Sequence, residues 1–267
     1  MTGGSTGPTG PGRPVDWDAA TYDRVADPQE EWGREVLARL TLRGDERALD
    51  AGCGSGRVTR HLLDLLPDGH VTGVDASPSM IGHARENLAE YGDRVELLVS
   101  DLLELELERP VEAVFSNATF HWILDHQRLF DRMFAALAPG GAFEAQCGGE
   151  GNVAEFKDAL ESCAGDQRFS AYLRGMPDVQ YFASVGDTEA RLQRSGFEIE
   201  RLWLERRDVS PPDPATFVAS VGLTHHLKRL PPELHDEFVA AVLGGMPRPL
   251  VLRYVRLNIS ARRPAAG

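Results

Sequence analysis

The sequence predicts an α/β protein with a doubly wound, mostly parallel seven-stranded sheet and helical insertions that form a cap. Three observations predict it. Short β-like segments alternate with helical ones through the first half of the chain. A glycine-rich loop, 52–56, directly follows the first of these segments. Acidic residues, Asp50, Asp75 and Asp101, come at the ends of the first three strands.

Composition limits the class of protein before any motif is considered. The chain has 267 residues, enough for one domain with a core of its own plus a modest cap. Its 28 Lys and Arg against 41 Asp and Glu give a net charge of −13, which argues against nucleic acid as a partner. No apolar leader and no stretch near ~18 apolar residues is present, so we expect a cytoplasmic protein without membrane contact.

Each element of the first half has a local signal. A helix from Arg57 ends at Pro67, another opens with Pro78 after Ser77, and a third stops at Pro139-Gly140-Gly141. Apolar spacing over 19–40, interrupted by Pro28, predicts two short helices. The strands that we expect are 47–51, 70–75, 95–99, 111–116, 142–147, 197–209 and 250–260. The helices that we expect after the first two are 57–66, 77–91, 129–137, 152–163, 170–176 and 187–195.

The chain divides by composition into three parts. Residues 1–14 are almost all Gly, Pro, Thr and Ser and predict a disordered tail. Residues 15–147 form the regular, cofactor-binding half. Residues 148–267 form the substrate-side half, with helical insertions over about 149–186 and 210–248 and the final strands. Such insertions commonly line a site at the carboxyl ends of strands.

The run ALDAGCGSG, 48–56, carries the clearest chemical signal. Glycines at 52, 54 and 56 let the backbone turn tightly and approach a ligand. A dinucleotide fingerprint would place its third glycine at position 57, which is Arg57. Asp50 before the loop suits an ammonium group and opposes a diphosphate. The loop therefore favours a nucleoside that bears an amino acid over NAD.

Two further acids fit the same ligand. Asp75, which follows Gly56 by 19 residues (75 − 56), can accept hydrogen bonds from both ribose hydroxyls. Asp101 can accept from an adenine amino group, and Met80 and Leu102 could sandwich the ring. The alternative role of Asp75 is to cap the following helix, and that of Asp101 is to stabilise a turn at the end of its strand.

These residues resemble the class I S-adenosylmethionine-dependent methyltransferases, a Rossmann-like fold. The likeness covers Asp16 to about Cys147. The runs WDAATYDRVADPQEEWGREVLARL and NATFHWILDHQRLF look most like the trans-aconitate methyltransferase branch, which often has Gln-Trp where this chain has His121-Trp122.

The resemblance implies which residues hold the cofactor. Asp50 to Gly56 and Asn117 would hold the methionine part, Asp75 the ribose and Asp101 the adenine, with Tyr22 as a lid, assisted by Gln29. The expected cofactor-binding set is Tyr22, Asp50, Ala51, Gly52, Cys53, Gly54, Asp75, Ala76, Met80, Asp101, Leu102 and Asn117.

The acceptor side has weaker signals. A carboxylate acceptor needs only a cationic clamp, for which Arg174, Arg253 and Lys228 are candidates. A phenol or protonated amine must lose a proton, and then His121 is the catalytic candidate, against a role that only shapes the pocket. His126 is expected on a surface turn. His225, His226 and His235 lack a helical ligand face, and three cysteines form no CxxC, so we expect no metal.

The predicted function is therefore S-adenosylmethionine-dependent methyl transfer to a small-molecule acceptor, a carboxylate or hydroxyl oxygen by preference. A nicotinamide-dependent oxidoreductase and a non-catalytic cofactor-binding module on the same fold are the alternatives. The acceptor itself and the oligomeric state are not predicted.

Overall fold

The structure is a computed structural model that describes residues 27–267. The predicted tail, 1–14, the predicted lid residue Tyr22 and the first of the two short helices expected before Leu40 lie outside these residues.

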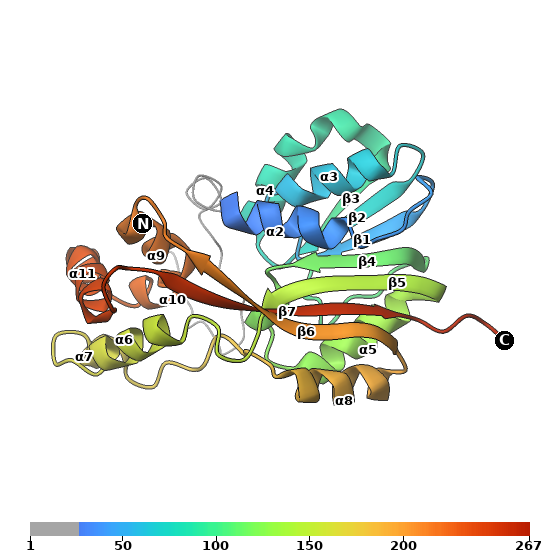
Figure 1. Cartoon of the computed structure of the whole chain (residues 1–267). Coiled ribbons are helices and arrows are strands. Elements are labelled where there is room, and N and C mark those ends of the chain that lie inside the picture. Colours follow the sequence, from blue (N-terminus) through green and yellow to red (C-terminus); the bar gives the residue numbers. More distant parts are fainter. Residues whose placement is uncertain (1–26) are drawn as a thin grey trace, which may run out of the picture.

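A seven-stranded sheet forms the centre of the chain, in the order β3-β2-β1-β4-β5-β7-β6 (Figure 1). The strands from β1 to β5 run parallel, and β7 is antiparallel to both its neighbours, so the predicted mostly parallel, doubly wound sheet is confirmed. The order reverses between β1 and β4, where the loops diverge and leave room for a ligand at the carboxyl ends. The strands are β1 (Arg47–Ala51), β2 (His70–Asp75), β3 (Val95–Val99), β4 (Val111–Asn117), β5 (Leu137–Gly148), β6 (Glu198–Val209) and β7 (Leu252–Arg262).

Helices cover both faces of the sheet (Figure 1). On one face lie α2 (Asp27–Leu37), α3 (Arg57–Leu65) and α4 (Pro78–Asn87), and on the other lie α5 (His126–Ala136) and α8 (Val185–Ser195). Apolar side chains of α2 and α3 pack on those of β1, β2 and β4, and apolar side chains of α5 and α8 pack on β4 and β5. Removal of these apolar surfaces from water holds the layers together.

A helical cap stands beyond the carboxyl ends of the parallel strands (Figure 1). It has its own apolar core, in which Phe156, Phe169, Phe217 and Phe238 are buried. Trp32 of α2 and Tyr254 of β7 belong to the same core, so the cap is packed on the sheet domain. The cap elements are α6 (Ala154–Ala164), α7 (Ser170–Leu173), α9 (Pro214–Val221), α10 (Thr224–Leu227), η3 (Pro232–Leu234) and α11 (His235–Gly245).

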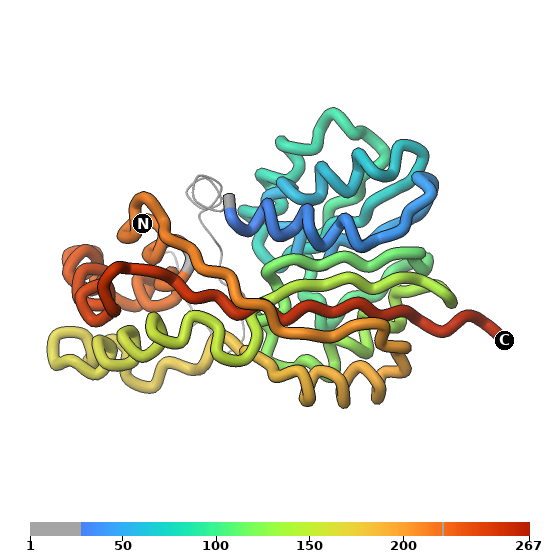
Figure 2. The backbone as a smooth tube through the Cα atoms, in the orientation of Figure 1, coloured from blue at the N-terminus to red at the C-terminus, as the bar shows by residue number. Residues whose placement is uncertain are grey.

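Strands β6 and β7 connect the cap to the sheet. The pairing of β5 with β7 ends at Gly148 and Arg256, whereas the pairing of β6 with β7 continues to Val209 and Leu252. The two strands therefore extend past the sheet as a ribbon. Figure 2 shows β7 running from the cap back through the sheet.

Most predicted elements are present, with differences at their ends. Pro28 does not interrupt α2 but stands in its first turn, where a missing N–H removes no helical bond. The strand expected over 142–147 begins at Leu137, which pairs with Val111 of β4, and Gly140 donates to the carbonyls of Arg263 and Pro264, far along the chain. Strand β3 has its predicted ends, but the helix before it is shorter than expected: α4 ends at Asn87, and a 3₁₀ segment, η1 (Ala89–Arg94), follows.

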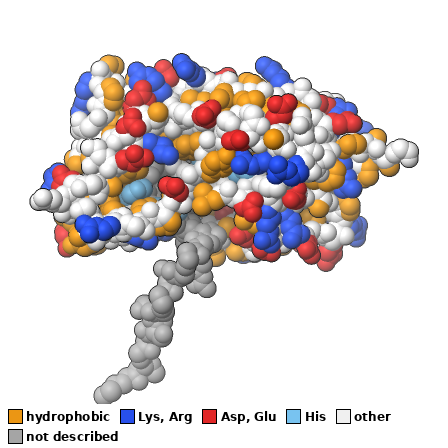
Figure 3. Space-filling model, turned by 90° about the horizontal axis from the view of Figure 1, so that it is seen from below, with side chains coloured by type: hydrophobic (Ala, Val, Ile, Leu, Met, Phe, Trp, Pro, Cys, Tyr) orange, Lys and Arg blue, Asp and Glu red, His pale blue; other side chains and the backbone are white. Residues whose placement is uncertain are grey.

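On the face that Figure 3 shows, acidic and basic side chains of the described residues are interspersed, and they form no continuous basic patch there. Among residues 27–267 no helix combines the length and the apolar character that a membrane crossing needs.

Candidate functional site

The glycine loop after β1 is held against β2 by its own backbone. The amides of Gly52 and Cys53 both donate to the carbonyl of Val74, at 2.8 and 3.0 Å. Ala51 and Cys53 are buried, and burial raises the pKa of the Cys53 thiol well above its ordinary value. The Cys53 thiol is therefore neutral at pH 7 and is not an activated nucleophile.

The three glycines of the loop have different surroundings. All have positive φ values, of 90°, 55° and 84° for Gly52, Gly54 and Gly56. A Cβ on Gly52 would lie 2.1 Å from Thr119 Oγ1, and one on Gly56 would lie 2.8 Å from a methyl of Leu88. Around Gly54, no described heavy atom lies within 4 Å of that position. Gly54 is thus the place where the loop backbone is open to a ligand.

Asp50 lies buried beneath this loop, at 2% exposure. Thr59 Oγ1 donates to its Oδ2 at 2.7 Å. Burial raises the pKa of Asp50 to about 7, and the nearby charge of Asp75 acts in the same direction. Since an approaching cation favours the ionised form, this carboxyl is suited to an ammonium group.

Asp75 connects the glycine loop to the start of α4. Its Oδ2 accepts from the Gly54 amide at 3.0 Å and its Oδ1 from the Ser77 amide at 2.8 Å. Ser77 caps α4 by accepting from the Met80 amide, so Asp75 is not needed as the cap. Burial raises the pKa of Asp75, and its hydrogen bonds from backbone amides, including that of Ala76, oppose the rise.

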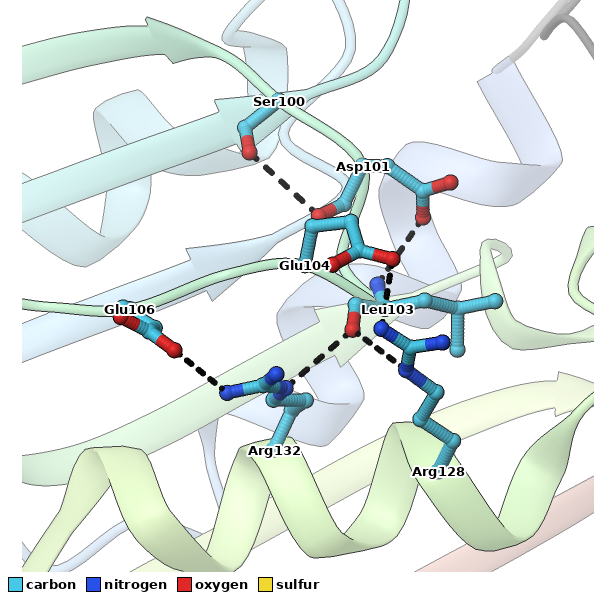
Figure 4. A network of polar contacts seen from close by, with 7 residues as sticks. All are labelled: Ser100, Asp101, Leu103, Glu104, Glu106, Arg128 and Arg132. Atoms are coloured by element: carbon cyan, nitrogen blue, oxygen red, sulfur yellow. Dashed lines mark hydrogen bonds and ion pairs between the residues drawn. The ribbon is translucent and has the colours of Figure 1, made fainter.

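Asp101 is exposed in the loop after β3, and two arginines of α5 hold that loop (Figure 4). The Leu103 amide donates to Asp101 Oδ1 at 2.9 Å. The Leu103 carbonyl accepts from Arg128 Nε and Arg132 Nε, at 3.0 and 3.2 Å. Two ion pairs add to this attachment, Arg128–Glu104 at 2.6 Å and Arg132–Glu106 at 3.0 Å.

The two apolar residues expected near Asp101 are both buried. Met80, in the first turn of α4, is 4% exposed, and Leu102 is 5% exposed. They lie at the carboxyl ends of β2 and β3, on the same edge of the sheet as Asp75 and Asp101.

Asn117, the last residue of β4, ties that strand to α2. Its Nδ2 donates to the Gln29 carbonyl at 2.7 Å, and Gln29 itself is 7% exposed. The side chain therefore fixes the start of α2, directly after the undescribed segment that contains Tyr22.

His121 follows β4 in the short helix η2 (Phe120–Trp122) and is 7% exposed. The Gly148 amide donates to its Nδ1 at 3.3 Å, so in the neutral ring the proton lies on Nε2. Burial, followed by the positive charge of Arg256, lowers the pKa of His121 well below its ordinary value. The ring is neutral at pH 7 and is a weak base.

The surface position expected for His126 is wrong. His126 opens α5 at 2% exposure, and its Nε2 donates to the Phe120 carbonyl at 2.9 Å. Asp125 caps the helix by accepting from the Arg128 amide. The helix thus starts three residues before the predicted Leu129, and its first turn is buried against η2.

A group of buried polar side chains on β5 and β7 was not singled out from the sequence. We call Gln146, Arg256 and Asn258, together with the partly buried Arg39 that follows α2, the buried polar network; the first three are 2% exposed or less. The available signal was a polar residue at every second position of β7, Arg256, Asn258 and Ser260, between apolar neighbours. Of the predicted clamps, Arg253 is exposed and pairs with Glu155 at 2.7 Å. Arg174 and Lys228 are also exposed.

The histidines of the cap form no metal site. Within residues 27–267, no group of three His, Cys, Asp or Glu side chains could hold an ion. His225 stacks on Trp122, with ring centroids 5.4 Å apart at 21°, and His226 stacks on Phe238. His235 donates to the Leu230 carbonyl.

Comparison with known proteins agrees with this geometry. A methyltransferase domain family matches residues 48–141. The trans-aconitate 2-methyltransferase of Methylobacterium nodulans is 30% identical over 261 residues, which cover 93% of this chain and 99% of that protein. The same enzyme of Methylobacterium radiotolerans is 36% identical over 132 residues, 49% of each chain.

Solved structures share the fold. Phosphoethanolamine N-methyltransferase 2 of Haemonchus contortus in complex with S-adenosyl-L-methionine superposes with a TM-score of 0.61 at 21% identity, over 92% of this chain and 56% of that one. The YcgJ protein of Bacillus subtilis gives 0.59 at 16% identity, over 88% of this chain and 99% of that one.

These matches decide between the alternatives raised by the sequence. A nicotinamide-dependent oxidoreductase and a module without turnover are not supported, and S-adenosylmethionine is the cofactor. The open backbone at Gly54 and the acids that end β1 and β2 fit it. The chain belongs to the S-adenosylmethionine-dependent methyltransferases, in the family that includes the trans-aconitate 2-methyltransferases.

Proposed function

We propose that the chain transfers a methyl group from S-adenosylmethionine to a carboxylate oxygen of a small polycarboxylate. The observation that carries this proposal is the likeness, over 93% of the chain, to a trans-aconitate 2-methyltransferase. The neutral, weakly basic state of His121 supports it, because a carboxylate is already anionic at pH 7 and needs no base.

The cofactor site is proposed at the carboxyl ends of β1 to β4. Asp50 and the loop 51–54 would hold the methionine part with Asn117, and Asp75 with Ala76 the ribose. The adenine would lie by Asp101, between Met80 and Leu102, and Tyr22 would cover the sulfonium. The openness at Gly54 and the position of Asp50 below it support this arrangement.

The cofactor supplies an activated methyl group on a sulfonium. The chain must hold the acceptor oxygen in line with the methyl–sulfur bond; the oxygen–methyl bond forms as the methyl–sulfur bond breaks, which leaves a methyl ester and S-adenosylhomocysteine. His121 then acts through its Nε2–H, which can donate to an acceptor oxygen and orient it. No proton has to be removed, and no metal is needed.

A labelled-methyl assay tests the acceptor class. Purified protein is incubated with labelled S-adenosylmethionine and trans-aconitate, other di- and tricarboxylates, phenols or amines. We expect labelling of carboxylates, with the label released as methanol on mild alkaline treatment, because esters hydrolyse there and ethers and methylamines do not. Alkali-stable label on a phenol or an amine, with none on carboxylates, would refute the proposal.

Replacing Asp75 by Ala tests the cofactor site. The variant loses the proposed ribose contacts, so S-adenosylhomocysteine should bind at least about fivefold more weakly by calorimetry, or ~1 kcal/mol. Asp68→Ala, an exposed residue at the other end of β2, is the matched control. Equal affinity of the Asp75 variant and wild type would remove Asp75 from the site.

A further inference from the structure

We propose that Phe182 is a positioning residue, which holds the imidazole of His121 as a neutral ring with its proton on Nε2; the expected effect on turnover rests on the proposed function. Phe182 lies in the segment between α7 and α8. Its ring is in contact with that of His121, with centroids 5.8 Å apart and planes tilted by 33°. Aromatic pairs at this distance are stabilising beyond the area that they bury. The contact therefore restrains the ring that the proposed reaction uses.

The backbone on either side of Phe182 is hydrogen-bonded to a different part of the site. The Tyr181 amide donates to the carbonyl of His121 at 2.9 Å. The carbonyl of Ala183, which is fully buried, accepts from the Glu150 amide at 3.0 Å, just after β5. The segment thus connects η2 to the end of β5, and Phe182 is fixed relative to both.

Gly148, the last residue of β5, lets the ring of Phe182 approach His121. A Cβ on Gly148 would lie 2.7 Å from a ring carbon of Phe182, so any larger residue would displace that ring. The amide of Gly148 donates to His121 Nδ1 at 3.3 Å. Because an amide N–H can only donate, Nδ1 is the unprotonated nitrogen of the neutral imidazole. Gly148 therefore selects the tautomer and leaves room for the ring that restrains it.

The second partner of Phe182 comes from the cap. Lys157 of α6 places its ammonium over the Phe182 ring, 5.1 Å from the centroid. A cation over the face of an aromatic ring is attracted by the quadrupole of that ring. Phe182 is thus in contact with both the cap and His121, and it transmits the position of one to the other.

The surroundings of His121 keep its ring neutral. Burial is the largest cause of its lowered pKa, and the positive charges of Arg256 and His126 act in the same direction. Phe182 belongs to this burial, so its removal should let water in and raise the pKa of His121 toward the ordinary range. The titratable and charged groups around His121 and its ring neighbours are Cys147 of β5, His126 of α5, Tyr181, Arg256 of β7, Lys157 of α6 and His225 of α10.

Long-range 1H–15N NMR tests the state of His121 without cofactor or acceptor. The spectrum of His121→Gln identifies the signals of His121, because they are missing from it. In wild type, Nδ1 should have the shift of an unprotonated nitrogen and Nε2 that of a protonated one, with no titration from about pH 5.5 to 8. In Phe182→Ala the two nitrogens should shift toward averaged tautomers and titrate near the ordinary pKa, about 6.5.

Tyr181→Phe is the matched control from the same segment. It removes the hydroxyl that contacts Asp187 and Arg191 and keeps the ring that packs on His126. Phe182→Ala should lower kcat about fivefold or more and leave the affinity for S-adenosylhomocysteine within about twofold of wild type. Tyr181→Phe should change neither kcat nor the signals of His121.

Gly148→Ala perturbs the same contact from the other side. It keeps the amide N–H but brings a Cβ against Phe182, so His121 should titrate in this variant as it does in Phe182→Ala. Gly148→Ala decides the question if Phe182→Ala does not fold. A proton on Nδ1 in wild type would overturn the proposal, and so would His121 signals and a kcat that are the same with and without Phe182.

The two proposals fail in different ways. If wild type methylates no carboxylate, the proposed function is wrong, and the NMR spectra still show whether Phe182 restrains His121. If wild type methylates carboxylates while His121 keeps its tautomer and its pKa without Phe182, only the role of Phe182 is wrong.

Discussion

Asp50 and Glu144 are buried carboxyls whose pKa values burial raises to about 7, one at the cofactor loop and one away from it. The same shift has different consequences at the two places. Burial favours the neutral form of both carboxyls, but at Asp50 the proposed ammonium group of the cofactor would favour the charged form.

The affinity for the cofactor product should depend on pH through Asp50. Below about pH 7 the free protein holds Asp50 protonated, so binding an ammonium group must release that proton and is weaker. We expect the affinity for S-adenosylhomocysteine to increase between pH 5.5 and 7 and to level above it. In Asp50→Asn the affinity should be low and flat. A wild-type affinity that does not change over this range would show that Asp50 does not face the ammonium.

Glu144 should make the fold less stable as pH rises. Its pKa is about 7 in the folded chain against 4.5 as the ordinary value, so the folded state binds the proton more tightly. This stabilisation is complete below pH 4.5 and is lost as pH rises to about 7. Glu144→Gln keeps an acceptor for Ser260, which donates to Glu144 at 2.7 Å.

Denaturant unfolding measures this effect. Relative to wild type, Glu144→Gln should gain about 1 kcal/mol or more in unfolding free energy from pH 5 to pH 8. Because Asp50 and Asp75 are the same in both proteins, the difference isolates Glu144. A constant difference over this range would contradict the raised pKa.

At the scale of elements, the loop after β3 depends on α5. Arg128 and Arg132, one turn apart, share the Leu103 carbonyl and so hold the loop that carries Asp101 (Figure 4). The double variant Arg128→Met with Arg132→Met should weaken S-adenosylhomocysteine binding about 3- to 10-fold, since the proposed adenine contact loses its support. Arg206→Met, an exposed arginine on β6, is the control. Unchanged affinity of the double variant would mean that the loop holds its position without α5.

Local signals predicted the elements well, and their ends less well. Strands β1 and β2 begin and end at the predicted residues because a glycine loop and a Ser-Pro helix start follow them. The early start of β5 at Leu137 depends on its pairing with Val111 of β4, which no local pattern reveals. In the same way the acids near the ends of β1 and β2 could be predicted to meet at one edge, but the buried polar network could not, because its members come from β5, β7 and the segment after α2.

At the scale of the whole molecule, one aromatic contact joins the cap to the loop of His121. His225 of α10 stacks on Trp122, and burial lowers the pKa of His225 to about 4, so both rings are neutral at pH 7. If the cap lines the acceptor side, as the insertions at the carboxyl ends of the strands predict, His225→Ala should raise the acceptor KM several-fold and leave S-adenosylhomocysteine affinity within twofold. Tyr172→Ala, 45% exposed elsewhere in the cap, should alter neither. A change in S-adenosylhomocysteine affinity without a change in acceptor KM would contradict the assignment of the cap to the acceptor side.

The position of β7 has a consequence for biosynthesis. It is the last strand of the sheet in sequence, yet it is inserted between β5 and β6. During translation β1 to β5 can pair with one another before β7 is made, whereas β6 has no strand partner until β7 leaves the ribosome. A chain that stopped before β7 would therefore leave one edge of β5 unpaired and β6 outside the sheet.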